Sequence, residues 1–228
     1  MARRGPTVYL PKPRLFSAAV GTDAAVAAYR EPLKLKPDHA GVHYNLAIAL
    51  KAKGDLDGAI AEYREAIRLQ PDNVNAHNNL GLALQTKGDH PGAIVQYRIV
   101  IGLQPDHVRA HNNLGNSLQT SGDLDGAIAA YRELVNAHPD HVKAHYNLGV
   151  ALQTKGDIDS AAQQFRTLVS LKDDYADAHY ALGEVLRQKG NKTEAAQAYR
   201  RYLSLESDTP DTHERREKAR ARLKELES

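Results

Sequence analysis

The sequence predicts an all-α protein, a solenoid of stacked antiparallel helix hairpins, and three observations support this fold class. The pattern that runs from Asn75 to Pro105 recurs with a period of 34 residues, so that Leu80 returns as Leu114 (114 − 80 = 34). Apolar residues within each period fall at helical spacing. A glycine followed by a polar residue divides each period into two helices. A period of this length is typical of an array of helical hairpins.

The composition excludes several classes of protein. The 228 residues carry a net charge of only +2, which gives no electrostatic argument for nucleic acid or a membrane surface. There is no cysteine, so disulfides and thiolate metal sites are excluded. No apolar run is long enough to cross a bilayer. We therefore expect a cytoplasmic protein that binds neither nucleic acid nor membranes.

The N-terminal part of the chain is the least regular. Residues 1–21 contain Pro6, Pro11 and Pro13, each of which removes an amide donor, and we expect an irregular segment there.

Residues 22–39 are predicted to form a partial repeat that has only the second helix of a hairpin. Thr22 or Asp23 can cap this helix at its start. Pro32 stands where the next repeat has Ala66, and we expect the helix to kink or to end about one turn early.

Five full repeats occupy residues 40–209. In the second repeat, Gly88 can take the left-handed conformation that ends one helix, and Asp89 can cap the next. At the end of the first repeat, Pro71 separates the second helix from the following repeat, and Asp72 is predicted to cap that repeat's first helix, as Asp106 and Asp140 are predicted to do later. The repeats are residues 40–73, 74–107, 108–141, 142–175 and 176–209.

Small and large residues alternate at fixed register where the helices must approach. Glycine recurs on the first helix, as at Gly81, and alanine on the second, as at Ala93. An aromatic residue such as Tyr97 follows each of these alanines by one turn. We expect these residues to interlock within each hairpin and against the next.

Residues 210–228 are predicted to form a terminal helix that covers the end of the array. The segment is dense in charge, and Ala219, Leu223 and Leu226 are its apolar seam. The end of a repeat array requires a helix whose outer face is polar and exposed to solvent.

The pattern Leu80-Gly81, Leu84, Ala93, Tyr97 and Pro105 in a 34-residue frame resembles the tetratricopeptide repeat. The resemblance covers residues 40–209 and implies a right-handed superhelix whose first helices line a concave groove for peptides or partner proteins. One departure is the histidine at His77 and its equivalents, where the family usually has tryptophan.

The groove is similar to the repeat region of O-linked N-acetylglucosamine transferase, in which an asparagine before the Leu-Gly pair holds the backbone of an extended peptide. The matching residues here are Asn45, Asn79, Asn113 and Asn147, and Ala181 interrupts the row. An amide both donates and accepts, so a row of amides can satisfy a peptide backbone without reading its side chains. These asparagines can equally be solvated filler. The predicted peptide-binding residues are Asn45, Asn75, Asn78, Asn79, Asn112, Asn113, Asn116, Asn147, Gln85, Gln119, Gln153, Arg109, Lys143 and Tyr146.

Other kinds of site receive less support. The pairs His39/His43, His107/His111 and His141/His145 have a chelating spacing, but no constant third ligand accompanies them, and we expect no metal. The inner histidines can also titrate near neutral pH and soften the hairpins in acid. A basic clamp for a carboxylate would need consecutive groove cations, which the sequence lacks.

We expect a non-enzymatic protein without a cofactor, because no nucleophile elbow, phosphate loop or zinc-protease motif is present. The preferred interpretation is a scaffold that binds an extended peptide or a partner protein in an asparagine-lined groove. One alternative is a substrate-recruiting accessory region of a glycosyltransferase system. Another is self-assembly through the partial repeat, whose helix lacks its hairpin partner.

Overall fold

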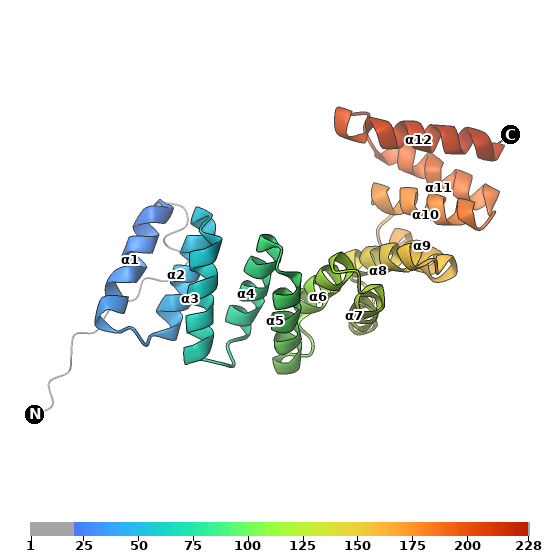
Figure 1. The fold of residues 1–228 in the computed structure, drawn as a ribbon. Helices are drawn as coiled ribbons and strands as arrows, with labels where there is room; N and C mark the ends of the chain where they lie inside the picture. The colour runs from blue at the N-terminus through green and yellow to red at the C-terminus, as the bar shows by residue number, and fades with distance from the viewer. Residues whose placement is uncertain (1–20, 228) are drawn as a thin grey trace, which may run out of the picture. The chain divides into compact units, whose positions relative to one another are not determined.

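The computed structural model describes residues 21–227, and within this range it contains twelve α-helices and no strand (Figure 1). The predicted all-α class is confirmed. None of the described helices is long and apolar enough to span a membrane. The predicted irregular segment, residues 1–21, lies outside the described residues except for Gly21. The helices are α1 (Thr22–Leu35), α2 (Ala40–Lys53), α3 (Leu56–Leu69), α4 (Val74–Lys87), α5 (His90–Leu103), α6 (Val108–Thr120), α7 (Leu124–Ala137), α8 (Val142–Lys155), α9 (Ile158–Leu171), α10 (Ala176–Gln188), α11 (Lys192–Leu205) and α12 (Pro210–Glu227).

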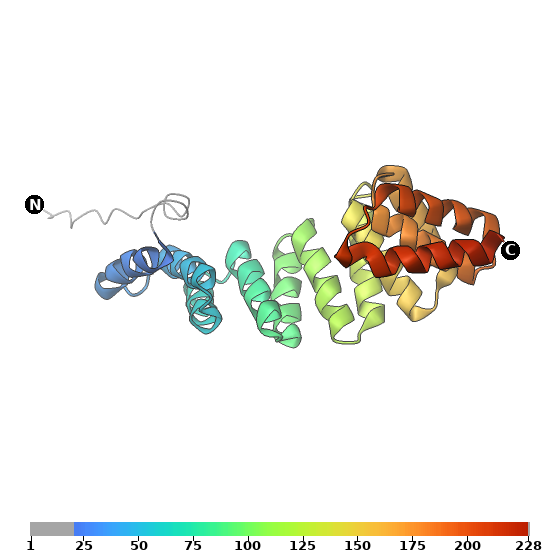
Figure 2. The ribbon, with the colours of Figure 1, turned by 90° about the horizontal axis from the view of Figure 1, so that it is seen from above.

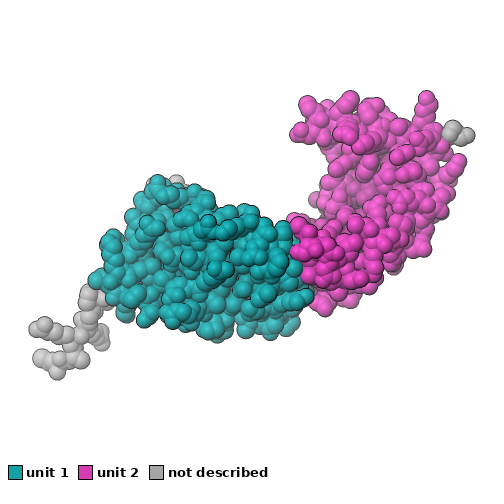
Figure 3. Space-filling model, viewed as in Figure 1, with its two compact units in different colours: residues 1–117 teal, residues 118–228 magenta. Residues whose placement is uncertain are grey.

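The chain divides into two compact units, residues 1–117 and 118–228, with the division inside α6 (Figure 3). In the first unit, α2 packs against α3 and α4 against α5, while α1 and α3 each pack against the first helix that follows them. In the second unit, α8 packs against α9 and α10 against α11, and α12 covers α11 (Figure 2). Each unit is therefore a stack of hairpins, as the period predicts.

The glycine-aspartate pairs end one helix and begin the next, as predicted. Gly88 has φ of 88°, in the left-handed region, and its amide donates to carbonyls of the preceding helix. The Asp89 side chain then accepts from the amide of Gly92. The same arrangement recurs at Gly54-Asp55 and Gly156-Asp157. Asn191 differs because its side chain makes no cap hydrogen bond.

The predicted caps of the first helices were wrong by one residue. Asp72 lies with Pro71 at the centre of a turn that is closed by the Asn73 amide donating to the Gln70 carbonyl, 3.2 Å away. The cap is Asn73, whose side chain accepts from the Ala76 amide. In the next two repeats, which contain Asp106 and Asp140, the Nδ1 atoms of the equivalent His107 and His141 accept from the amides of Ala110 and Ala144.

The expectations for α1 were also wrong. Neither Thr22 nor Asp23 caps the helix, since Gly21 is the N-cap and no side chain caps it. The helix continues through Pro32 to Leu35, and the Lys36 amide donates to the Pro32 carbonyl. Proline so close to a helix end removes one ladder hydrogen bond and leaves the last turn able to form.

A glycine of the first helix faces an aromatic ring of the second helix in several hairpins. An added Cβ at these glycines would lie 2.6 to 2.8 Å from a ring carbon, which is closer than real Cβ atoms come to their neighbours. The rings themselves are almost fully buried. The pairs are Gly81 with Tyr97, Gly149 with Phe165 and Gly183 with Tyr199. The predicted pairing of small with large residues is confirmed.

The recurring histidines tie the turn between repeats to the hairpin behind it. In the second repeat, His77 Nε2 lies 3.0 Å from the Pro71 carbonyl oxygen, and Nδ1 lies 2.8 Å from Gln96 Oε1 on α5. His145 makes the same two contacts two repeats later, with Pro139 and Gln164. Both ring nitrogens of the histidine thus take part in hydrogen bonds, one to the turn and one to the second helix. The softening of the hairpins in acid stays a prediction.

The terminal helix α12 is fixed by a buried arginine. Arg216 is 9 % exposed and stands at the register position where the repeats have leucine. Its Nη1 donates to the carbonyls of Leu203 and Glu206 at the end of α11. A cation at this place satisfies unpaired carbonyls and complements the negative end of the helix dipole.

The ring-glycine contact predicts a difference between two glycine-to-alanine changes. Gly149→Ala should lower the free energy of unfolding by up to about 2 kcal/mol, because overpacking costs about 1–3 kcal/mol and the helix propensity of alanine returns about 1. Gly102→Ala is the control, since nothing lies within 4 Å of a Cβ built there. It should be neutral or stabilising by up to about 1 kcal/mol. Urea unfolding measures both, and equal effects would contradict the packing argument.

The corrected cap gives a second test. Asn73→Ala should destabilise the protein by about 1 kcal/mol, because the Ala76 amide loses its acceptor. Asp72→Ala should change stability by less than about 0.5 kcal/mol, since Asp72 is an exposed turn residue. Thermal unfolding of the two variants decides between the two caps, and a larger loss at Asp72 would restore the original prediction.

Candidate functional site

The asparagine row of the first helices lies at the surface in both units. Asn45, Asn79 and Asn113 belong to the first unit and Asn147 to the second, and all four are partly exposed. Each occupies the same register on its helix, so they repeat at 34-residue intervals. Partial exposure leaves amide groups accessible while the helix backbone holds them in place.

Contacts between neighbouring repeats orient two of these amides in the first unit. Asn79 Nδ2 on α4 donates to the Tyr44 hydroxyl on α2, 3.0 Å away. Burial raises the pKa of the Tyr97 hydroxyl above its ordinary value, and a hydrogen bond with Asn113 offsets part of that rise. The first helices of consecutive repeats therefore share one polar surface.

The second predicted row is less accessible than the sequence suggests. Asn78 and Asn112 are each only 8 % exposed. Asn78 Nδ2 makes a long contact of 3.5 Å with Asn79 Oδ1, and Asn78 Oδ1 is buried without a partner. These two asparagines lie behind the surface row and offer little area to a ligand.

The predicted glutamines have different partners in different repeats. Gln85 Oε1 accepts from the Tyr97 hydroxyl at 3.0 Å, and Gln119 Oε1 accepts from the Tyr131 hydroxyl at 3.4 Å. Gln153 has no equivalent donor, because the ring opposite it is Phe165. Two of the glutamines thus have a structural role, and the third is the one whose amide a ligand can use.

The remaining predicted residues fall into two groups. Asn75, Arg109 and Lys143 are exposed at the start of their helices, and Asn116 is partly exposed. Tyr146 is partly exposed and belongs to an aromatic cluster, with its ring centre 6.0 Å from that of Phe165 and 5.5 Å from that of Tyr175.

Three helices of the second unit enclose a recess. It has a volume of about 200 Å³, and α8, α10 and α12 supply all of its lining. The sequence analysis predicted Tyr146 and Gln153 as site residues but none of the charged residues of the lining. The signal was present, because Asp177, Tyr180 and Glu184 stand at the same register positions as Lys143, Tyr146 and Val150. The lining residues are Tyr146, Val150, Gln153, Asp177, Tyr180, Ala181, Glu184 and Arg215.

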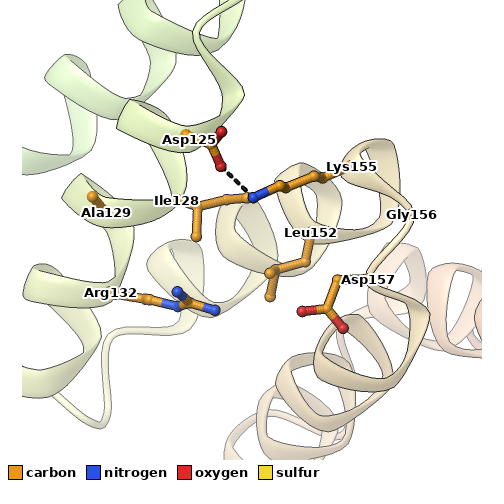
Figure 4. A pocket seen from close by; sticks show the side chains of 8 residues that line it. All are labelled: Asp125, Ile128, Ala129, Arg132, Leu152, Lys155, Gly156 and Asp157. Atoms are coloured by element: carbon orange, nitrogen blue, oxygen red, sulfur yellow. Dashed lines mark hydrogen bonds and ion pairs between the residues drawn. The ribbon is translucent and has the colours of Figure 1, made fainter.

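The joints between repeats also form recesses, of about 430 Å³ in the first unit and 350 Å³ in the second. Figure 4 shows the latter, where Lys155 at the end of α8 makes an ion pair with Asp125 at the start of α7. Arg132 and the cap residue Asp157 complete its charged lining, and they balance one another. The neutral balance and the structural pairing make these recesses weaker candidates.

The histidine pairs have a structural explanation. His107 and His141 are N-caps, and their i + 4 partners bind turn carbonyls. Across residues 21–227, no group of three or more histidine, aspartate, glutamate or cysteine side chains is placed to hold a metal ion.

Comparisons with solved structures show the fold. YrrB, described as a TPR protein with an unusual peptide-binding site, matches with a TM-score of 0.72 and 20 % identity over 86 % of this chain and all of the other. A MamA structure matches with a TM-score of 0.70 and 23 % identity over 76 % of this chain and 95 % of that one. PilF from Pseudomonas aeruginosa gives 0.71 and 16 % identity over 92 % and 93 % of the two chains. No curated protein matches the sequence.

Family models identify the repeats directly. A model described as TPR repeat matches residues 48–88. A model described as tetratricopeptide repeat matches residues 78–135, 112–169 and 146–211, which together cover more than half of the sequence. With the hairpins, glycine stops and buried rings on the same period, the matches show that this chain belongs to the tetratricopeptide repeat family.

Proposed function

We propose that the chain is a protein-interaction scaffold that binds an extended peptide along the partly exposed asparagines of its first helices. The observation that carries the proposal is the position of the Asn79 amide, which reaches across to Tyr44 of the preceding repeat and remains partly exposed. Three such amides lie in the first unit at one register, and Asn147 stands at the same register on its own helix in the second unit.

The chemistry of the row suits a peptide backbone. Each amide offers both a donor and an acceptor, which are the two groups that an extended chain presents. Packed helices lie about 8–10 Å apart, and an extended chain advances about 3.3 Å per residue. One amide can therefore engage about every third peptide unit. Asparagine is a poor helix former, so its recurrence at four partly exposed positions has a cost in stability that binding would justify.

The comparisons support the same function without fixing its details. Binding to other proteins and peptides is what the family resemblance implies, and the description of YrrB names a peptide-binding site. Asn78 and Asn112 are left out of the proposed contact surface because they are buried. Self-association through α1 stays a prediction, which the 79 % exposure of Leu35 at the end of that helix makes worth testing by light scattering. The glycosyltransferase alternative also stays a prediction.

Replacing Asn45, Asn79 and Asn113 together by alanine should weaken peptide binding by at least about tenfold, because several backbone hydrogen bonds of about 0.5–1.5 kcal/mol each are lost. An array of immobilised unstructured peptides of varied sequence measures this. The free energy of unfolding should change by less than about 1 kcal/mol, because the better helix propensity of alanine offsets much of the loss of the hydrogen bonds to the Tyr44 and Tyr97 hydroxyls.

The matched control replaces exposed glutamines of the same unit, Gln70 and Gln104, by alanine. These residues follow the second helices and lie away from the asparagine row, so the control should bind as the wild type does. Equal binding by the asparagine variant and the wild type would remove the amide row from the function.

A further inference from the structure

At two positions of the asparagine register, the side chain contacts a tyrosine on the first helix of the preceding repeat. Asn79 donates to the Tyr44 hydroxyl of the preceding first helix. In the next-to-last position of the series, Ala181 faces α8 and carries no polar group. In the last position, Arg215 of α12 occupies the register, since 215 − 181 = 34.

Arg215 shows what kind of group fits beside a tyrosine at this register. Its guanidinium carbon lies 5.5 Å from the ring centre of Tyr180, and its Nη1 makes an ion pair with Asp177. Both Arg215 and Asn79 place a planar hydrogen-bond donor next to the tyrosine of the preceding first helix. The chain thus supplies a planar donor for Tyr44 and for Tyr180.

Tyr146 receives no planar donor from the residue at this register in the following repeat, and Arg215, which lines the same recess, lies over the ring of Tyr180. Ala181 stands where the planar donor would come from, and the recess of about 200 Å³ opens at this place. A volume of this size is below the roughly 300–1,000 Å³ of small-molecule pockets and is suited to one side chain.

A second departure from the repeat falls in the same recess. In the second and third repeats, a tyrosine hydroxyl donates a hydrogen bond to the carbonyl oxygen of the glutamine at the end of the first helix, as Tyr97 does to Gln85. Phe165 has no hydroxyl, so the Gln153 carbonyl oxygen lacks this donor. Two independent substitutions therefore leave an aromatic face and an amide acceptor open to a single ligand group.

The hydrogen-bonding character of the lining indicates what kind of group it can take. Asp177 pairs with Arg215 and Glu184 with Arg187, so these charges balance, and the groups left to a ligand are acceptors. Glu184 Oε1 accepts from the buried Tyr199 hydroxyl at 2.5 Å, and Oε2 lies 3.3 Å from Arg187. A carboxylate has further acceptor sites beyond these two partners.

We propose that this recess binds the guanidinium group of an arginine side chain of the peptide, a proposal that rests on the function given above. The ring of Tyr146 receives the planar cation, as Tyr180 receives Arg215. Glu184 and the Gln153 carbonyl oxygen accept hydrogen bonds from the guanidinium nitrogens. The peptide arginine thus gives Tyr146 the planar donor that Asn79 gives to Tyr44 and Arg215 gives to Tyr180.

A probe of a single amino acid tests the recess separately from the asparagine row, because so short a probe cannot span several asparagines. Nα-acetyl-arginine methylamide is titrated into the full chain and followed by NMR, alongside the citrulline analogue, which has nearly the same shape without charge. The arginine probe should bind at least about tenfold more tightly than the citrulline probe. The lysine and leucine analogues should both bind more weakly than arginine.

Three variants locate the binding. Ala181→Asn should abolish the preference for arginine, because the amide then covers Tyr146 as Asn79 covers Tyr44. Glu184→Gln should reduce it, and this change keeps an acceptor for the Tyr199 hydroxyl. Ala129→Asn is the control, since Ala129 is an exposed helical alanine on α7 outside this recess, and it should bind as the wild type does.

The outcomes separate this inference from the proposed function. Equal binding of arginine and citrulline, tighter binding of lysine or leucine, or an unaltered preference in Ala181→Asn would each overturn the arginine site. If unstructured peptides bind and the asparagine variant loses them, the function stands even then. Arginine-specific binding to the recess in a protein that captures no peptide would overturn the function and leave the recess as a guanidinium site.

Discussion

The contact between a glycine of the first helix and an aromatic ring of the second is the constraint on which the rest of the structure depends. Helices of a hairpin can approach closely only where one of them lacks a side chain, and Gly149 provides that place for Phe165. The ring fixes the separation and the rotation of the two helices together. Because the rotation is fixed, the opposite face of the first helix is also fixed, and that face carries the candidate site.

Much of the fold follows from the sequence because its signals are local and repeated. Gly88 and Asp89 act on the two helix ends that they adjoin, so their roles need no tertiary information. Asp72 was misassigned because a proline-aspartate turn and a helix cap call for the same residue type. The hydrogen bond from the Asn73 amide to the Gln70 carbonyl shows that Asp72 lies in the turn, and the bond from the Ala76 amide to the Asn73 side chain shows that the cap comes one residue later.

The candidate site was predicted only in part, for a reason of helix geometry. Asn78 and Asn79 are adjacent in sequence but lie about 100° apart around the helix axis, so one is buried and the other is not. Identical residue types gave no way to tell them apart. The recess at Ala181 was hidden for a different reason: an absent side chain appears in the sequence as an interruption, and its meaning depends on Tyr146 and Arg215, which other helices contribute.

The ion pairs at the joints have a consequence for the mechanics of each unit. Asp57 pairs with Lys87 and Asp125 with Lys155, each time between the second helix of one hairpin and the first helix of the next. Exposed pairs contribute at most about 1 kcal/mol, and salt screens charges over about 8–10 Å. The buried rings inside a hairpin feel no such screening. Ionic strength therefore changes how strongly neighbouring hairpins of a unit are coupled, while each hairpin stays intact. The resistance of a unit to bending thus depends on the salt concentration of the solvent.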